Sequence, residues 1–201
     1  MALRQPRFAC RLAPVIWNVA SFKRMTDIER NSILDAIDVL NDLVNDLVAG
    51  TMVFANYQSR FTMGKLSQPG IVAVQKMCVS HLILGLNKLC EFWEVFHRLV
   101  PAELRPEMKG LVSELQRRGI KEFRNTVVAH VWDRKRGRTR TQSEVIAQLN
   151  EISAGDPGGF LMWLNNPNDN AYPKTVVSIV QALRDHLRGQ HDVSTDEVFR
   201  R

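Results

Sequence analysis

The amino-acid sequence predicts an all-α fold, a helical bundle built on two long antiparallel helices with shorter helices toward the C-terminus. Apolar residues recur at helical spacing over residues 26–50 and again over 71–99. The segment between them is rich in turn-forming residues, so the two helices should run in opposite directions and pack side by side. The β-branched run at 126–131 could be read as a strand, but its helical flanks favour a helix.

The first helix is predicted to begin at Thr26, because residues 26–29 have the pattern of a capping box. Thr26 would accept a hydrogen bond from an early backbone N–H group, and Glu29 would reach back. An apolar stripe follows on a helix of about 25 residues, and its members are Ile33, Ile37, Leu40, Val44 and Leu47. The opposite face carries aspartates that we interpret as solvated rather than metal-binding: Asp35, Asp38, Asp42 and Asp46.

The second long helix is predicted over 71–99, after a loop or broken connection at 56–70. Pro69 suits the first turn of this helix, where its missing N–H group has no intrahelical partner to lose. The helix is apolar around most of its circumference. Such a helix is either central to a bundle or buries a second face against another subunit. This surplus of apolar surface predicts a two-fold homodimer.

Four shorter helices are predicted after the two long ones, over 106–117, 120–132, 144–153 and 175–187. Ser143 is expected to cap the helix over 144–153. The Gly/Pro/Asn-rich region between the last two helices is interpreted as a loop that its own apolar residues fasten to the core. The charged C-terminus is expected to fray.

Composition fits a soluble, cytoplasmic globular protein. The chain has 201 residues, of which 45% are hydrophobic and 24% charged, as in one domain with appendages. No run of residues approaches the roughly 18 consecutive apolar positions that a membrane span requires. Of the three cysteines, Cys78 and Cys90 fall in an apolar helical pattern. They are interpreted as buried, reduced thiols, which favours a reducing compartment.

Positive charge is concentrated in two segments. Residues 1–25 and 134–140 each carry five basic residues and no acidic one, whereas the rest of the chain holds more acidic than basic residues. This asymmetry indicates a polyanionic partner such as nucleic acid at two local sites. The alternative is a basic arm and a solvated loop. We therefore divide the chain into a basic N-terminal arm or extension (1–25), a helical domain (26–190) and a charged tail (191–201).

The residues best suited to chemistry lie in the run Glu-Phe-Arg-Asn-Thr-Val-Val-Ala-His at 122–130. His130 can move protons near neutral pH, and Arg124 can hold a phosphate through two parallel hydrogen bonds. Asn125 could hydrogen-bond a ribose, a phosphate or its counterpart in a dimer. On an ideal α-helix Arg124 and His130 would lie about 120° apart, so the arginine must reach round or the helix must end nearby. A basic run then follows, consisting of Arg134, Lys135, Arg136, Arg138 and Arg140.

This motif resembles that of the HEPN superfamily (higher eukaryotes and prokaryotes nucleotide-binding domains), in the form found in its abortive-infection branch. The resemblance covers residues 26–190, since two long helices before the motif and shorter ones after it also match that fold. It implies a metal-independent endoribonuclease of toxin or phage-defence type, without a cofactor, in which two motifs face each other across a homodimer. His130 would be the acid/base group, Arg124 would stabilise charge on the phosphate, and Asn125 would position them.

The partners that this resemblance implies are RNA, held by the basic run, and a second copy of the chain. In HEPN toxins silenced by adenylylation, a tyrosine stands two residues after the histidine. Trp132 occupies that position here and has no hydroxyl group to modify, which argues against an adenylylating antitoxin.

Two alternatives remain open on the sequence. One is a non-catalytic dimeric RNA-binding or interaction module of the same fold, in which Arg124 pairs with Glu122 or Asp133 and His130 caps a helix. The other, a helical DNA-binding regulator, is weaker, because no helix-turn-helix pair is evident. The sequence shows neither a zinc-ligand spacing nor a Gly-rich phosphate loop.

Overall fold

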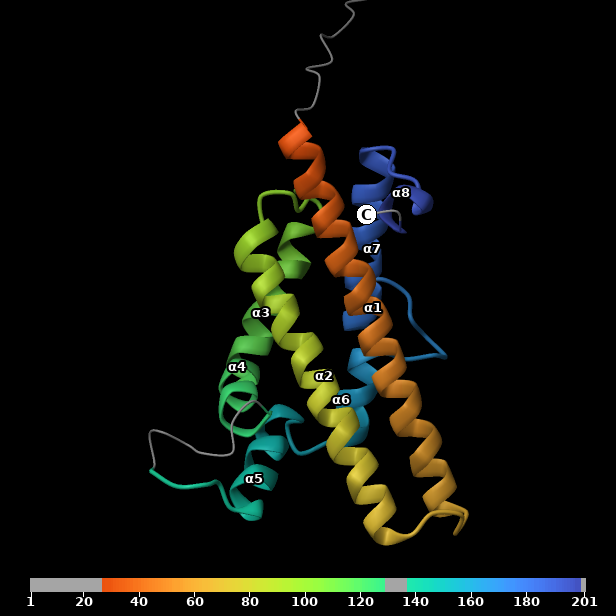
Figure 1. Cartoon of the computed structure of the whole chain (residues 1–201), viewed down its shortest axis with the longest axis vertical. Coiled ribbons are helices and arrows are strands. Elements are labelled where there is room, and N and C mark those ends of the chain that lie inside the picture. The colour runs from red at the N-terminus through yellow and green to blue at the C-terminus, as the bar shows by residue number, and fades with distance from the viewer. Residues whose placement is uncertain (1–26, 129–136, 200–201) are drawn as a thin grey trace, which may run out of the picture.

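A computed structural model of the chain describes residues 27–128 and 137–199, and these residues form a bundle of helices (Figure 1). No strand occurs in those two ranges, which confirms the all-α fold class. The elements are α1 (Asp27–Thr62), α2 (Gln68–Phe96), α3 (Arg105–Arg117), α4 (Ile120–Phe123), the π-helix η1 (Arg124–Val128), α5 (Gln142–Ile152), α6 (Pro157–Leu164), α7 (Val176–Gln190) and α8 (Thr195–Phe199).

The two long helices α1 and α2 form an antiparallel hairpin, and α7 lies along α1 (Figure 1). The predicted stripe of α1 is buried in full, and it meets Leu86 and Leu89 of α2 in the core. Gly50 permits the close approach of the two helices, because a Cβ atom there would lie 2.8 Å from Leu82 Cδ2. The buried hydroxyl of Thr51 accepts a hydrogen bond of 3.0 Å from Asn165, which ties the end of α6 to the hairpin.

The hairpin is longer than the sequence indicates. Residues 56–62, which the sequence predicts as part of a loop, continue α1, so that only 63–67 connect the two helices. This extension lacks the apolar stripe, but α2 runs beside it and Gln75 donates a hydrogen bond of 3.1 Å to Gln58. Gly64, at φ +69°, ends the helix in the left-handed conformation that glycine favours. The capping box predicted at Thr26 lies outside the described residues.

The cap of α5 differs from the prediction. Thr141 rather than Ser143 occupies the N-cap, and it forms a capping box with Glu144. Both residues fit the sequence preference for a hydroxyl cap. Only Thr141 has an acidic residue three positions later, which is what completes the box.

The region predicted as a loop between the last two helices contains α6. Asp156 caps this helix by accepting a hydrogen bond of 2.9 Å from the Gly159 backbone N–H, and Pro157 occupies the first turn. Its apolar run ends in the fully buried Leu164. The glycines that suggest a loop therefore lie in the first turn of a short helix.

Residues 191–199 of the C-terminal tail pack against the hairpin, where the sequence predicts a frayed end. Val193 and Val198 are buried in the core cluster. Arg30 of α1 forms an ion pair of 2.6 Å with Glu197 of α8. The helix α7 before it begins at Thr175 as predicted, with a capping box completed by Ser178.

Candidate functional site

The segment before the motif is held firmly on α2. After α3 ends at Arg117, Gly119 takes a left-handed conformation with φ +72°, and this turn starts α4. The side chains of Ile120 and Phe123 are both buried in the core. The backbone at Arg124 therefore starts from a fixed position.

The motif itself departs from the helix that the sequence predicts over 120–132. The α-helix ends at Phe123, and Arg124–Val128 form the π-helix η1. The hydroxyl group of Thr126 donates a hydrogen bond of 2.7 Å to the Glu122 carbonyl, a contact that competes with regular helical bonding. π-helical turns are rare and frequently occur at functional sites.

The angle of about 120° expected between Arg124 and His130 assumes an ideal α-helix. It does not apply to this segment, because a π-helix turns less per residue than an α-helix. His130 and Trp132 lie outside the described residues, as do Asp133 and three of the basic residues, Arg134, Lys135 and Arg136.

Arg124 is held by its neighbour in the motif. Its Nη1 donates a hydrogen bond of 2.8 Å to Asn125 Oδ1, so the two predicted site residues lie together. Its Nε is buried and has no acceptor among the described residues. Glu122, which could have neutralised Arg124, instead lies 3.7 Å from the guanidinium of Arg140. A buried donor without an acceptor is costly and calls for an explanation, and a ligand oxygen is one.

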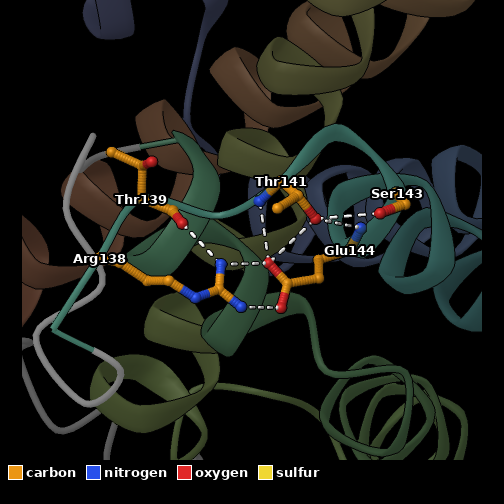
Figure 2. Close-up of polar contacts among 5 residues, drawn as sticks. All are labelled: Arg138, Thr139, Thr141, Ser143 and Glu144. Atoms are coloured by element: carbon orange, nitrogen blue, oxygen red, sulfur yellow. Dashed lines mark hydrogen bonds and ion pairs between the residues drawn. The ribbon is translucent and has the colours of Figure 1, made fainter.

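Arg138 already has a carboxylate partner. Figure 2 shows its guanidinium donating to both carboxylate oxygens of Glu144, at 2.9 and 2.6 Å, and to the Thr139 carbonyl at 2.9 Å. Glu144 also accepts a hydrogen bond from the Thr141 backbone N–H at 2.9 Å. The hydrogen bonds from Arg138 lower the pKa of Glu144 to about 2. This arrangement fixes the start of α5.

Arg140 has a structural environment too, since its side chain is only 6% exposed. Together with Glu122 it links the start of α5 to α4. The RNA-binding role of all five basic residues stays a prediction, and the guanidinium groups of Arg138 and Arg140 would have to leave these partners to take it.

A cluster around Arg118 could not be predicted from the sequence. This side chain is 15% exposed, donates to Glu114 at 2.6 Å and to the Ile152 carbonyl, and lies 4.7 Å from the Trp163 ring centre and 5.7 Å from that of Phe160. Its aromatic partners are more than 40 positions away in the sequence, so no local pattern reveals them. The cluster joins the end of α3 to α5 and α6.

The buried environment predicted for two cysteines is observed, whereas Asp46, predicted to be solvated, has ionic partners on α2. Cys78 and Cys90 are buried free thiols, and burial raises the pKa of Cys90 to about 11. Asp46 pairs with Lys88 Nζ at 3.0 Å and lies 3.5 Å from His81 Nε2. In the described ranges no group of three or more His, Cys, Asp or Glu side chains could hold a metal ion.

The outer face of α2 carries exposed apolar residues beside the exposed charged residues Lys88 and Glu91. Met77, Leu84 and Val95 are exposed, and their spacings of seven and eleven residues place them on one side of the helix. Among the described helices, α2 alone is long and apolar enough to cross a membrane. Its most apolar 18-residue stretch has a mean hydropathy of 1.4, and a third of that stretch is buried in the bundle. The core helix of a soluble protein meets the same criterion.

Comparison with known proteins supports the fold and nothing finer. No protein-family model and no curated protein matches the sequence. The chain is similar to a solved structure from the mobile metagenome of V. paracholerae, integron cassette protein Vpc_cass2, with a TM-score of 0.65. The similarity covers 78% of this chain and 96% of that one, at 20% sequence identity. An identity this low carries information on the fold alone.

Proposed function

We propose that the chain is a metal-independent endoribonuclease of toxin or abortive-infection type, as its resemblance to the HEPN superfamily implies. The observation that carries the proposal is the state of Arg124. Its Nη1 donates to Asn125, its Nε has no acceptor, and no carboxylate in the described ranges pairs with it. A phosphate group would supply both the acceptor and the compensating charge.

The reaction is cleavage of RNA by its own ribose. The 2′-hydroxyl oxygen attacks the adjacent phosphorus, and the proton of that hydroxyl passes to the catalytic acid/base side chain. The bond from phosphorus to the 5′-oxygen breaks, and that oxygen takes a proton. The products are a 2′,3′-cyclic phosphate and a 5′-hydroxyl end. His130 provides the acid/base group, Arg124 stabilises the charge that builds on the phosphate, and Asn125 positions Arg124.

The site works as a homodimer in this proposal. The exposed side chains of Met77, Leu84 and Val95 offer apolar surface to a second copy, and η1 lies against the same helix α2. Two motifs would then face each other across the two-fold axis. Light scattering at micromolar concentration should give twice the mass of the chain, and a monomer there would argue against a shared site.

The decisive experiment follows a labelled RNA in the presence of EDTA and measures cleavage and binding in parallel. Wild-type protein should cleave the RNA, and His130→Ala should lose cleavage by about 10²–10⁴-fold while still binding RNA. Arg98→Ala, an exposed arginine outside the motif, is the control and should cleave normally. Cleavage that needs added magnesium, or that His130→Ala retains in full, would contradict the proposal.

A second candidate is a non-catalytic dimeric RNA-binding or interaction module of the same fold. The exposed apolar side chains on α2 favour it, because an interaction surface there requires no chemistry at the motif. It predicts RNA or protein binding without cleavage in the same assay. In either case we propose a cytoplasmic location, which suits the buried thiols, and no adenylylating antitoxin.

A further inference from the structure

A cavity of about 210 Å³ lies between the α1–α2 hairpin and the pair α5–α6. Its walls come from all four helices, with Phe54 of α1, Val79 of α2, Ile146 and Leu149 of α5, and Leu161 of α6 among them. No charged side chain of the described residues lines it. The cavity shares no lining residue with the Arg124 motif, so a ligand held there would be independent of the proposed function.

The cavity exists because α5 packs incompletely against the hairpin. Ile152, the last residue of α5, is its one buried residue. Leu149 is half-buried, and Ile146 is exposed at the rim. An apolar molecule that fills this gap would remove the apolar face of α5 from water and add van der Waals contacts. Both changes lower the free energy of the complex.

Two polar residues interrupt the apolar lining, Asn150 and Ser153. The Ser153 hydroxyl donates a hydrogen bond of 3.3 Å to the Asn150 backbone carbonyl, which leaves the hydroxyl oxygen able to accept one. The lining can therefore satisfy a single hydrogen-bonding group on an occupant. A charged group would lose its hydration here without an ionic partner.

We propose that this cavity binds a small, uncharged aromatic molecule of one or two rings with at most one hydrogen-bonding group. An apolar cavity of about 150 Å³ is enough to hold benzene, so this volume suits up to a bicyclic ring. Phe54 and Phe160 in the walls offer faces and edges for aromatic packing. A rigid ring also loses less conformational entropy on binding than an alkyl chain of the same size.

An occupant would touch the cluster that holds the end of α3. Phe160 lines the cavity and also lies 5.8 Å from the Trp163 ring and 5.7 Å from the Arg118 guanidinium. Binding should therefore raise the thermal stability of the full chain as well as fill the cavity.

The test is calorimetric titration of the full chain with indole, and with benzoate as a charged probe of similar size. Indole should bind with a dissociation constant on the order of 10⁻⁴ M and raise the unfolding temperature, and benzoate should bind at least about tenfold more weakly. Leu161→Trp fills the cavity and should weaken indole binding at least about tenfold. Met162→Trp makes the same change at a neighbouring residue that is 44% exposed and outside the lining, and it should leave binding within about twofold.

Ile146→Trp provides a second obstruction if Leu161→Trp does not fold, since position 146 is exposed at the rim and tolerates a larger side chain. Circular dichroism confirms folding of each variant. The proposal is overturned if indole does not bind at millimolar concentration, or if benzoate binds as tightly as indole. It is also overturned if every obstructing variant that folds binds indole as tightly as wild type.

Discussion

The α1–α2 hairpin and the motif segment that follows α3 differ in whether their buried polar groups have hydrogen-bond partners. In the hairpin the apolar stripe of α1 is buried against α2, and the buried polar side chain of Thr51 has a partner in Asn165. In the motif segment the α-helix gives way to a π-helix, and the buried Nε of Arg124 has no acceptor in the described ranges. A protein keeps such departures where function offsets their cost in stability.

The buried core of the hairpin should respond to substitution through stability alone, and it gives the largest expected effect. Leu86→Ala removes a fully buried side chain from the core and should lower the free energy of unfolding by about 2–5 kcal/mol. Val72→Ala, near the start of the same helix and 47% exposed, should cost less than about 1 kcal/mol. Urea unfolding measures both, and equal losses would mean that the core is not where the hairpin places it.

Substitution in the motif should instead reduce RNA cleavage without lowering the free energy of unfolding. Arg124→Leu should reduce RNA cleavage by about 10²–10³-fold, because a preorganised charge is lost from the phosphate site. Its free energy of unfolding should stay the same or rise, because the buried unpaired Nε now costs roughly 1–3 kcal/mol. Urea unfolding and the cleavage assay on the same preparation check the two halves. A variant that cleaves RNA normally but unfolds easily would make Arg124 a structural residue.

The sequence reveals the hairpin far better than the motif, for a physical reason. The stripe from Ile33 to Leu47 repeats over several turns, so its burial can be predicted from spacing alone. The π-helix spans five residues, too few for a period to distinguish it from an α-helix. The amphipathic pattern over 175–187 likewise predicts the last long helix, and Thr175 is its N-cap. The partners of Arg118 depend on contacts between distant segments, which spacing does not encode.

Arg118 lies between the core and the motif segment, and only 15% of its side chain is exposed. Arg118→Ala removes a hydrogen bond to a backbone carbonyl and the contact with two rings, and should cost about 1–3 kcal/mol. Arg117→Ala is the matched control, since its side chain is 68% exposed and pairs with the same Glu114. Surface pairs contribute little, so its cost should stay below about 1 kcal/mol. Thermal unfolding of the two variants side by side gives the difference.

The smallest effect is the pH dependence of two ion pairs outside the hairpin core. Hydrogen bonds from Arg138 lower the pKa of Glu144 to about 2, and those from Arg117 and Arg118 do the same for Glu114, against an ordinary value of 4.5. Their stabilising contribution is therefore complete above pH 4.5 and is lost as the pH falls from 4.5 toward 2. Unfolding measured across that window should show a shallower loss of stability in Glu144→Gln than in wild type, and an unchanged slope would mean that Arg138 does not hold Glu144 in solution.

We propose that the Arg124–Asn125–His130 motif cleaves RNA through the ribose 2′-hydroxyl, and such cleavage leaves characteristic chemical ends on the RNA fragments. A defined RNA is incubated with the full chain in EDTA, and the fragments are analysed by mass. We expect 2′,3′-cyclic phosphate and 5′-hydroxyl ends from wild-type protein, and intact RNA with His130→Ala. Ends bearing a 3′-hydroxyl and a 5′-phosphate would rule this mechanism out, as would the absence of any cleavage by the wild-type protein.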